Sequence, residues 1–153
     1  MYENILIPTD GSDTANVAVS HAVDLAKKYN ARLHALYVVD VDAVNLSLGT
    51  EQIDRIRQGN FGEMHELQED ADDATGAVVD AAAEHDVAVH EEVRVGTPHD
   101  VIAGYADNQD IDLVVMGSHG RSGVRRALLG SVTERVLRST HVPVLVVDEH
   151  EEA

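Results

Sequence analysis

The chain has 153 residues, of which 44% are hydrophobic and 3% aromatic, so its core must consist mainly of aliphatic side chains. The absence of cysteine excludes disulfides and thiolate metal sites, and no apolar run approaches the roughly 20 residues of a membrane span. With 28 acidic and 11 basic residues the formal net charge is −17, which disfavours nucleic acid as a partner because its phosphates would meet a repelling surface.

The acidic excess also concerns the solvent in which the protein works. Lysine occurs only at Lys27 and Lys28, and an acidic surface poor in lysine is typical of halophilic proteins. The alternative is an acidic protein from a cytoplasm of ordinary salt. Residues 1–4 lack the basic start and apolar run of a signal peptide, so we expect a cytoplasmic protein.

Strand and helix patterns alternate along the chain. We expect strands over residues 2–8, 33–39, 87–95, 113–116 and 143–147, and helices over 14–29, 63–84, 98–108 and 131–139. Ser12 or Asp13 is expected to cap the first helix, and Thr97 to cap the helix that Pro98 begins. Residues 42–61 are interpreted as a mobile insertion that holds a short helix. This alternation predicts an α/β fold, an open parallel five-stranded sheet with helices on both faces, as one domain over residues 1–153.

A glycine-rich segment, residues 117–123 (GSHGRSG), directly follows the wholly apolar strand 113–116. Ligands of open α/β sheets bind beyond the carboxyl ends of strands, and glycines let backbone N–H groups approach an anion closely. A flexible surface loop is an equally good explanation of this segment alone.

Two further features favour an anion. Gly130 precedes a helix whose free N–H groups can bind phosphate, although Ser131 and Glu134 also fit a capping box that needs no ligand. Between residues 117 and 138 the only acidic residue is Glu134, whereas five of the 11 basic residues lie there: Arg121, Arg125, Arg126, Arg135 and Arg138. A positive, glycine-rich loop before a helix start is typical of a polyphosphate site.

The spacing Gly117-x2-Gly120-x9-Gly130-Ser131 resembles the ATP-binding signature of the universal stress protein family. Residues 5–12 (ILIPTDGS), 37–40 (YVVD), 95–99 (VGTPH) and 143–147 (PVLVV) are similar to that family as well, so the resemblance covers nearly the whole chain outside residues 42–61.

The resemblance implies a set of nucleotide-binding residues. Pro8, Thr9 and Asp10 would border the nucleoside, the Val38 backbone would face adenine, Met116 and Gly117 would lie on the ribose side, and Gly120, Arg121, Gly130, Ser131, Val132 and Thr133 would surround the phosphates. A side chain at Gly117 or Gly130 would then intrude on the ligand and leave the fold largely intact. If Asp10 and Gly117 share a ligand, their strands are neighbours, which gives the sheet order 3-2-1-4-5.

The sequence offers less support for metals and catalysis. The nine histidines are scattered, and only His119 lies in the expected site. ATP could bring Mg²⁺ or Mn²⁺, with Asp10 as a carboxylate ligand. There is no P-loop lysine, no G-x-G-x-x-G and no G-x-S-x-G motif, and Ser118-His119 lacks an evident third member of a triad.

The resemblance implies an ATP-binding regulator or stress-response module with at most slow ATP hydrolysis. Two alternatives stay open: a nucleotidyl-transfer or ATP-pyrophosphatase-like enzyme on the same fold, and a dimeric scaffold without nucleotide. We expect a homodimer, because the apolar strand from Pro143 to Val147 would be a sheet edge that carries no charged residue and is free to pair with a second copy.

Overall fold

The computed structural model describes residues 2–40, 65–119 and 129–148. The insertion expected at 42–61 and the site residues Gly120 and Arg121 lie outside these ranges. In chain order the elements are β1 (Asn4–Pro8), α1 (Asp13–Tyr29), β2 (Arg32–Asp40), α4 (His65–Ala83), β3 (Val89–Gly96), α5 (Pro98–Asn108), β4 (Leu113–Gly117), α6 (Ser131–Ser139) and β5 (Val144–Val147). They agree with the predicted elements to within a few residues.

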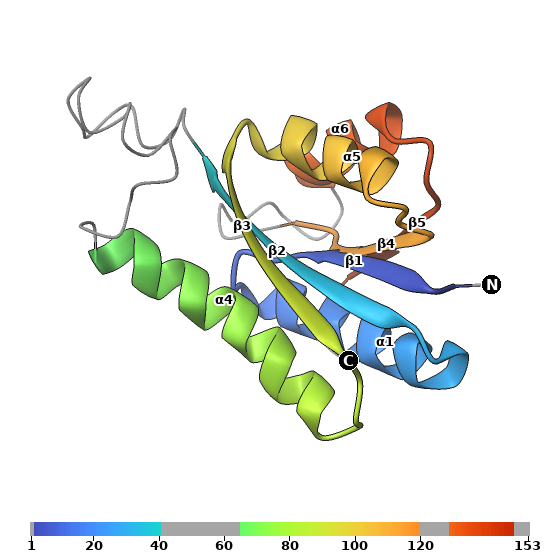
Figure 1. Cartoon of the computed structure of the whole chain (residues 1–153). Coiled ribbons are helices and arrows are strands. Elements are labelled where there is room, and N and C mark those ends of the chain that lie inside the picture. The colour runs from blue at the N-terminus through green and yellow to red at the C-terminus, as the bar shows by residue number, and fades with distance from the viewer. Residues whose placement is uncertain (1, 41–64, 120–128, 149–153) are drawn as a thin grey trace, which may run out of the picture.

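The five strands form one sheet in the order β3-β2-β1-β4-β5, with every neighbouring pair parallel. Helices α1 and α4 cover one face of the sheet and α5 and α6 cover the other (Figure 1). The predicted fold class and strand order are therefore confirmed. The last strand begins at Val144 instead of Pro143, because Pro143 has no N–H and contributes only its carbonyl, which accepts from the Val114 N–H at 2.9 Å.

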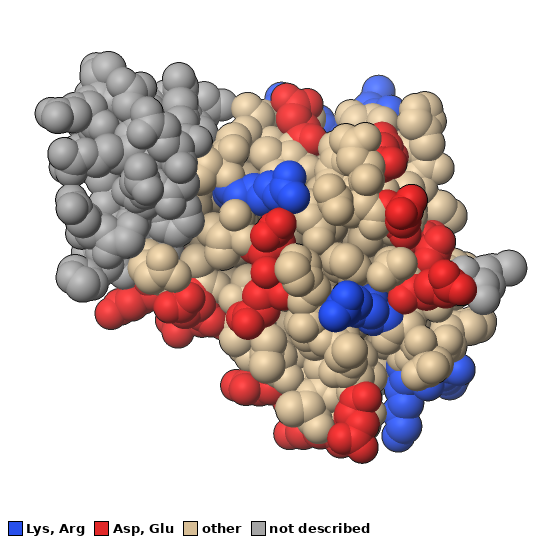
Figure 2. All heavy atoms as spheres, viewed as in Figure 1, with Lys and Arg blue, Asp and Glu red and all other residues tan. Residues whose placement is uncertain are grey.

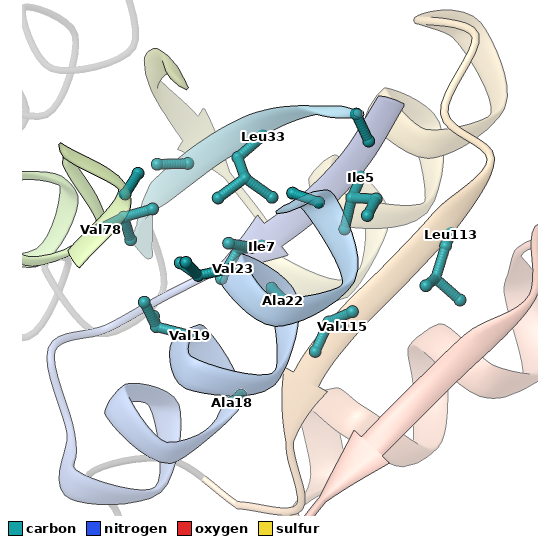
Figure 3. Packing of buried hydrophobic residues seen from close by; sticks show 14 of the residues in the cluster. Ile5, Ile7, Ala18, Val19, Ala22, Val23, Leu33, Val78, Leu113 and Val115 are labelled. Carbon is teal, nitrogen blue, oxygen red and sulfur yellow. The ribbon is translucent and has the colours of Figure 1, made fainter. Parts of the chain in front are cut away.

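Successive side chains of each strand point to opposite faces, so each face of the sheet has its own core. Ile5 and Ile7 of β1 pack with α1 and α4, whereas Leu6 between them packs with α5 and α6. Figure 3 shows the first of these cores, in which small residues of α1 such as Ala18 and Ala22 lie over the strands. As the composition requires, the buried members of this core in the described part of the chain are all aliphatic.

The helix starts are built in different ways. Ser12 caps α1 as predicted, with its Oγ accepting from the Ala15 N–H at 3.2 Å. Thr97 occupies the cap position of α5 and Pro98 its first turn, but the Thr97 side chain makes no capping hydrogen bond. The expected capping box at Ser131 is wrong: Gly130 is the N-cap of α6 and Ser131 is its first helical residue.

A partly buried pair of polar side chains joins the sheet to α5. His34 Nδ1 lies 2.8 Å from the hydroxyl of Tyr105, and His34 Nε2 lies 3.1 Å from Asn4 Oδ1. Burial, followed by the charges of His90 and Arg32 and opposed by Glu92, lowers the pKa of His34. Burial likewise raises the pKa of the Tyr105 hydroxyl. The neutral forms of both side chains are thus favoured in the folded protein.

Among the charged side chains on the visible surface, acidic ones are more widespread than basic ones (Figure 2). Figure 2 shows Asp and Glu spread over one face, with Lys and Arg as isolated patches among them. Among the residues that the structure describes, no helix combines the length and the apolar character needed to cross a membrane.

Candidate functional site

The candidate site lies where β1 and β4, which are neighbours in the sheet, reach their carboxyl ends. From β1 the chain passes to α1 on one face, whereas the helix that follows β4 is α6 on the opposite face (Figure 1). This divergence is a topological switch point, the place where open α/β sheets bind ligands. The sequence predicted both the strand order and this location.

The turn after β1 is fixed by its own polar groups. The Thr9 N–H donates to the Leu36 carbonyl of β2 at 2.9 Å, and Thr9 Oγ1 accepts from the Gly11 N–H at 3.2 Å. Asp10 Oδ1 accepts from the Ser12 N–H at 2.9 Å, and Gly11 has a φ of 79°, in the left-handed region that favours glycine. Thr9 is buried and Asp10 is half-buried. The Asp10 carboxylate therefore contributes to the shape of the turn, beside any role toward a ligand.

Gly117, the last residue of β4, is crowded by α1. A Cβ atom at this position would lie 2.8 Å from Thr14 Cγ2 and 3.2 Å from the Thr14 carbonyl carbon. Real Cβ atoms essentially never approach so closely, and α1 would have to move to accommodate it. The expectation that a side chain here leaves the fold largely intact is therefore wrong, because Gly117 is already required for packing within the chain.

Gly130 is also restricted, although less severely than Gly117. A Cβ atom on Gly130 would lie 3.1 Å from His119 Cα and 3.4 Å from the Ser118 carbonyl oxygen. The Gly130 N–H donates to that carbonyl at 2.7 Å, so the chain before α6 lies directly against the end of β4. The two signature glycines that the structure describes thus both have an internal steric role.

We call Gly130, Ser131, Val132 and Thr133 the α6 start. Gly130 has no side chain that could cap the helix, in contrast to Ser12 at the start of α1. The Thr133 hydroxyl points inward and donates to the Gly117 carbonyl at 2.9 Å, and Val132 packs against the core. The Gly130 N–H is already bonded to the Ser118 carbonyl, so what the α6 start offers to an anion is the backbone N–H groups of its helical residues, together with the exposed Ser131 side chain.

The remaining predicted residues contribute mainly backbone as well. Met116 is 5% exposed and packs in the core beneath α5 and α6, so only its backbone is accessible to a ribose. Pro8 is buried, and Val38 is partly buried against the same core. The pairing of Pro8 with Leu36 places Val38 two residues farther along β2, beside the turn that follows β1.

A chain of polar side chains at this site was missed by sequence reasoning. Ser118 Oγ donates to Asp148 Oδ1 at 2.7 Å and lies 3.2 Å from His119 Nδ1, while His119 Nε2 lies 3.0 Å from Thr14 Oγ1. In a hydrolytic triad the carboxylate binds the imidazole, whereas here the Asp148 carboxylate accepts from the serine hydroxyl. Asp148 is 30 residues from Ser118, so only the pairing of β4 with β5 reveals the contact.

The expected metal ion has no preassembled protein site in the described residues, among which no three His, Asp or Glu side chains are grouped to bind one. Mg²⁺ is commonly held by one or two carboxylates together with substrate phosphates, so a metal at Asp10 would depend on the nucleotide.

The sequence model of the Universal stress protein family matches residues 1–148. The chain belongs to this family. It is 40% identical to Universal stress protein MJ0531 of Methanocaldococcus jannaschii, over 96% of this chain and 82% of that protein.

Solved structures agree with this membership. The structure of MJ0577, also from Methanocaldococcus jannaschii, superposes with a TM-score of 0.78 at 30% identity, covering 99% of both chains. A universal stress protein solved in complex with cAMP superposes with a TM-score of 0.62 at 27% identity, covering 96% of this chain and 97% of the other. Nucleotide binding thus occurs on this fold in a related protein.

Proposed function

We propose that this universal stress protein binds ATP at the switch point between β1 and β4 and acts as a regulatory stress-response module. The adenosine would lie at the ends of β1 and β2, near Pro8, Thr9, Asp10 and Val38, with the ribose beside Met116 and Gly117. The phosphates would bind the α6 start together with Gly120 and Arg121. The whole chain would then work as one nucleotide-binding domain of the cytoplasm.

One observation carries the proposal: the N-terminus of α6 is held against the carboxyl end of β4, and its inward side chains are already used in packing, so the N–H groups of its first helical residues are what it can offer to a ligand. Thr133 and Val132 hold the helix against β4 and the core, and Gly130 is tied to Ser118. A helix N-terminus held in this way presents fixed partial positive charge to a phosphate. The complex of a related protein with cAMP supports an adenine nucleotide as the ligand.

Calorimetric titration with ATP, AMP and adenosine, in molar KCl with Mg²⁺, tests the proposal. ATP should bind to the wild type. Arg121→Ala should lower the affinity for ATP and leave the affinity for adenosine unchanged, since only ATP presents the full set of phosphates. Loss of one charge-assisted hydrogen bond corresponds to about 1.5–3 kcal/mol. If the wild type shows no heat with ATP at millimolar concentration, the scaffold alternative without nucleotide is favoured instead. Formation of AMP and pyrophosphate with a second substrate would favour the enzyme alternative.

We also propose that two copies pair through β5. This strand is the edge of the sheet, and Leu145 on it is 37% exposed. An apolar edge strand of this kind is a template for pairing, here antiparallel about a two-fold axis. Light scattering should give a dimer for the wild type and a monomer for Leu145→Lys. Glu91→Lys changes the charge of the opposite edge strand, β3, and should leave the dimer intact; loss of the dimer in both variants would contradict the assignment to β5.

A further inference from the structure

The hydrogen bonds around Ser118 carry an inference about how the α6 start is held in place. Ser118 is 4% exposed, and its peptide and side chain both bridge between elements. Its N–H donates to the Val147 carbonyl of β5 at 2.8 Å, and its carbonyl accepts from the Gly130 N–H at 2.7 Å. The residue before it, Gly117, accepts from the Thr133 hydroxyl. Two consecutive carbonyls at the end of β4 therefore fix the α6 start.

The side chain of Ser118 fixes the direction of the hydrogen bonds in the polar chain. A carboxylate oxygen only accepts, so the Ser118 hydroxyl proton must point to Asp148. Ser118 Oγ can then only accept from its other partner, which places a proton on His119 Nδ1. In the neutral imidazole, Nε2 is consequently an acceptor, and it lies 3.0 Å from Thr14 Oγ1.

We propose that Ser118 is a positioning residue for the phosphate-binding α6 start, and that it holds His119 in the Nδ1–H tautomer. The directed chain runs from Thr14 on α1 through His119 and Ser118 to Asp148 after β5. These side-chain hydrogen bonds hold the peptide of Ser118 in place, and the Ser118 carbonyl in turn holds the Gly130 N–H. Ser118 itself need not touch the nucleotide. The positioning role rests on the proposed ATP site, whereas the tautomer does not.

Ser118→Ala breaks the chain and leaves the backbone hydrogen bonds in place. It should lower the affinity for ATP about tenfold, the effect of losing one good hydrogen bond. The affinity for adenosine should change less than about twofold, because adenosine would not contact the α6 start. Ser118→Cys, which is nearly isosteric and a poor donor, should behave in the same way and serves if the alanine variant does not fold. Thr75→Val is the matched control: it removes another buried hydroxyl, which donates to the Ala71 carbonyl within α4.

Nitrogen-15 NMR of the imidazole provides the readout that a merely structural serine would not change. The neutral His119 ring, assigned with His119→Gln, should show the Nδ1–H pattern in the wild type and in Thr75→Val, and should lose it in Ser118→Ala. An Nε2–H pattern in the wild type, or equal weakening of ATP and adenosine in Ser118→Ala, would overturn the proposal. If the wild type binds no ATP, the proposed function and the positioning role both fail, whereas the tautomer result still shows whether the hydrogen-bond chain is correctly directed.

Discussion

Ser131 is the first helical residue of α6, and a proline can replace it without removing any hydrogen bond within the helix. Its N–H group is one of those that an α-helix leaves unpaired and that the proposed site uses for phosphate. Gly130 before it has φ −64° and ψ 151°, which is the extended conformation that the residue preceding a proline prefers. Ser131→Pro is therefore expected to leave the free energy of unfolding within about 0.5 kcal/mol of the wild type.

The same substitution removes one N–H group from the phosphate site. A hydrogen bond to a charged group contributes about 1.5–3 kcal/mol, so ATP should bind roughly 10- to 150-fold more weakly, and adenosine should bind as before. Ser131→Ala is the matched control, because it removes the hydroxyl and keeps the N–H. Calorimetric titration of the three proteins with ATP and adenosine separates the contributions of the Ser131 N–H and the Ser131 hydroxyl to binding. Urea unfolding of the same proteins measures their stability.

If Ser131→Pro and Ser131→Ala bind ATP equally well, the backbone of the α6 start does not hold the phosphates and the proposed site is wrong. If Ser131→Pro instead unfolds at a much lower urea concentration than the wild type, Ser131 is not the first helical residue of α6. The assignment of Gly130 as the cap is then wrong, whatever the ligand.

Gly117→Ala should destabilise the protein by about 1–3 kcal/mol, because the new Cβ contacts Thr14. Gly76→Ala in α4, where a Cβ meets nothing within 4 Å, should stabilise it by about 0.5–1 kcal/mol. Urea unfolding that ranks the two variants the other way would contradict the packing argument. The pKa of His34 is lower in the folded protein than in the unfolded chain, so the unfolded chain takes up a proton at higher pH. The free energy of unfolding should therefore fall as the pH drops below about 6.5. In His34→Gln this fall should be shallower between about pH 7.5 and 5.5. The thermal midpoint should rise steeply with KCl, since screening of the net charge of −17 shortens the Debye length from about 30 Å at 0.01 M to about 3 Å at 1 M, and a midpoint independent of salt would refute a halophilic surface.

The alternation of elements and the location of the site could both be predicted from sequence because they depend on local signals. The apolar run before Gly117 identifies β4 as a buried strand, and the pattern after Ser12 identifies α1, each within one short window. Adjacency of β1 and β4 also followed, once Asp10 and Gly117 were assigned to a common ligand. Each of these inferences uses residues that are close together or a single topological rule.

Other features depend on contacts between distant parts of the chain, and only the tertiary structure decided them. The sequence motif explained Gly117 by a ligand, whereas packing against Thr14 of α1 requires a glycine there in any case. Ser131 fits a capping box by spacing, but Gly130 is the cap, because its backbone is extended and its carbonyl accepts the first helical hydrogen bond, from the Glu134 N–H. No local pattern could place Asp148 on Ser118, since β4 and β5 become neighbours only when the sheet assembles. Periodicity identifies which residues are buried, whereas the partner of each buried group is fixed by which elements pack together.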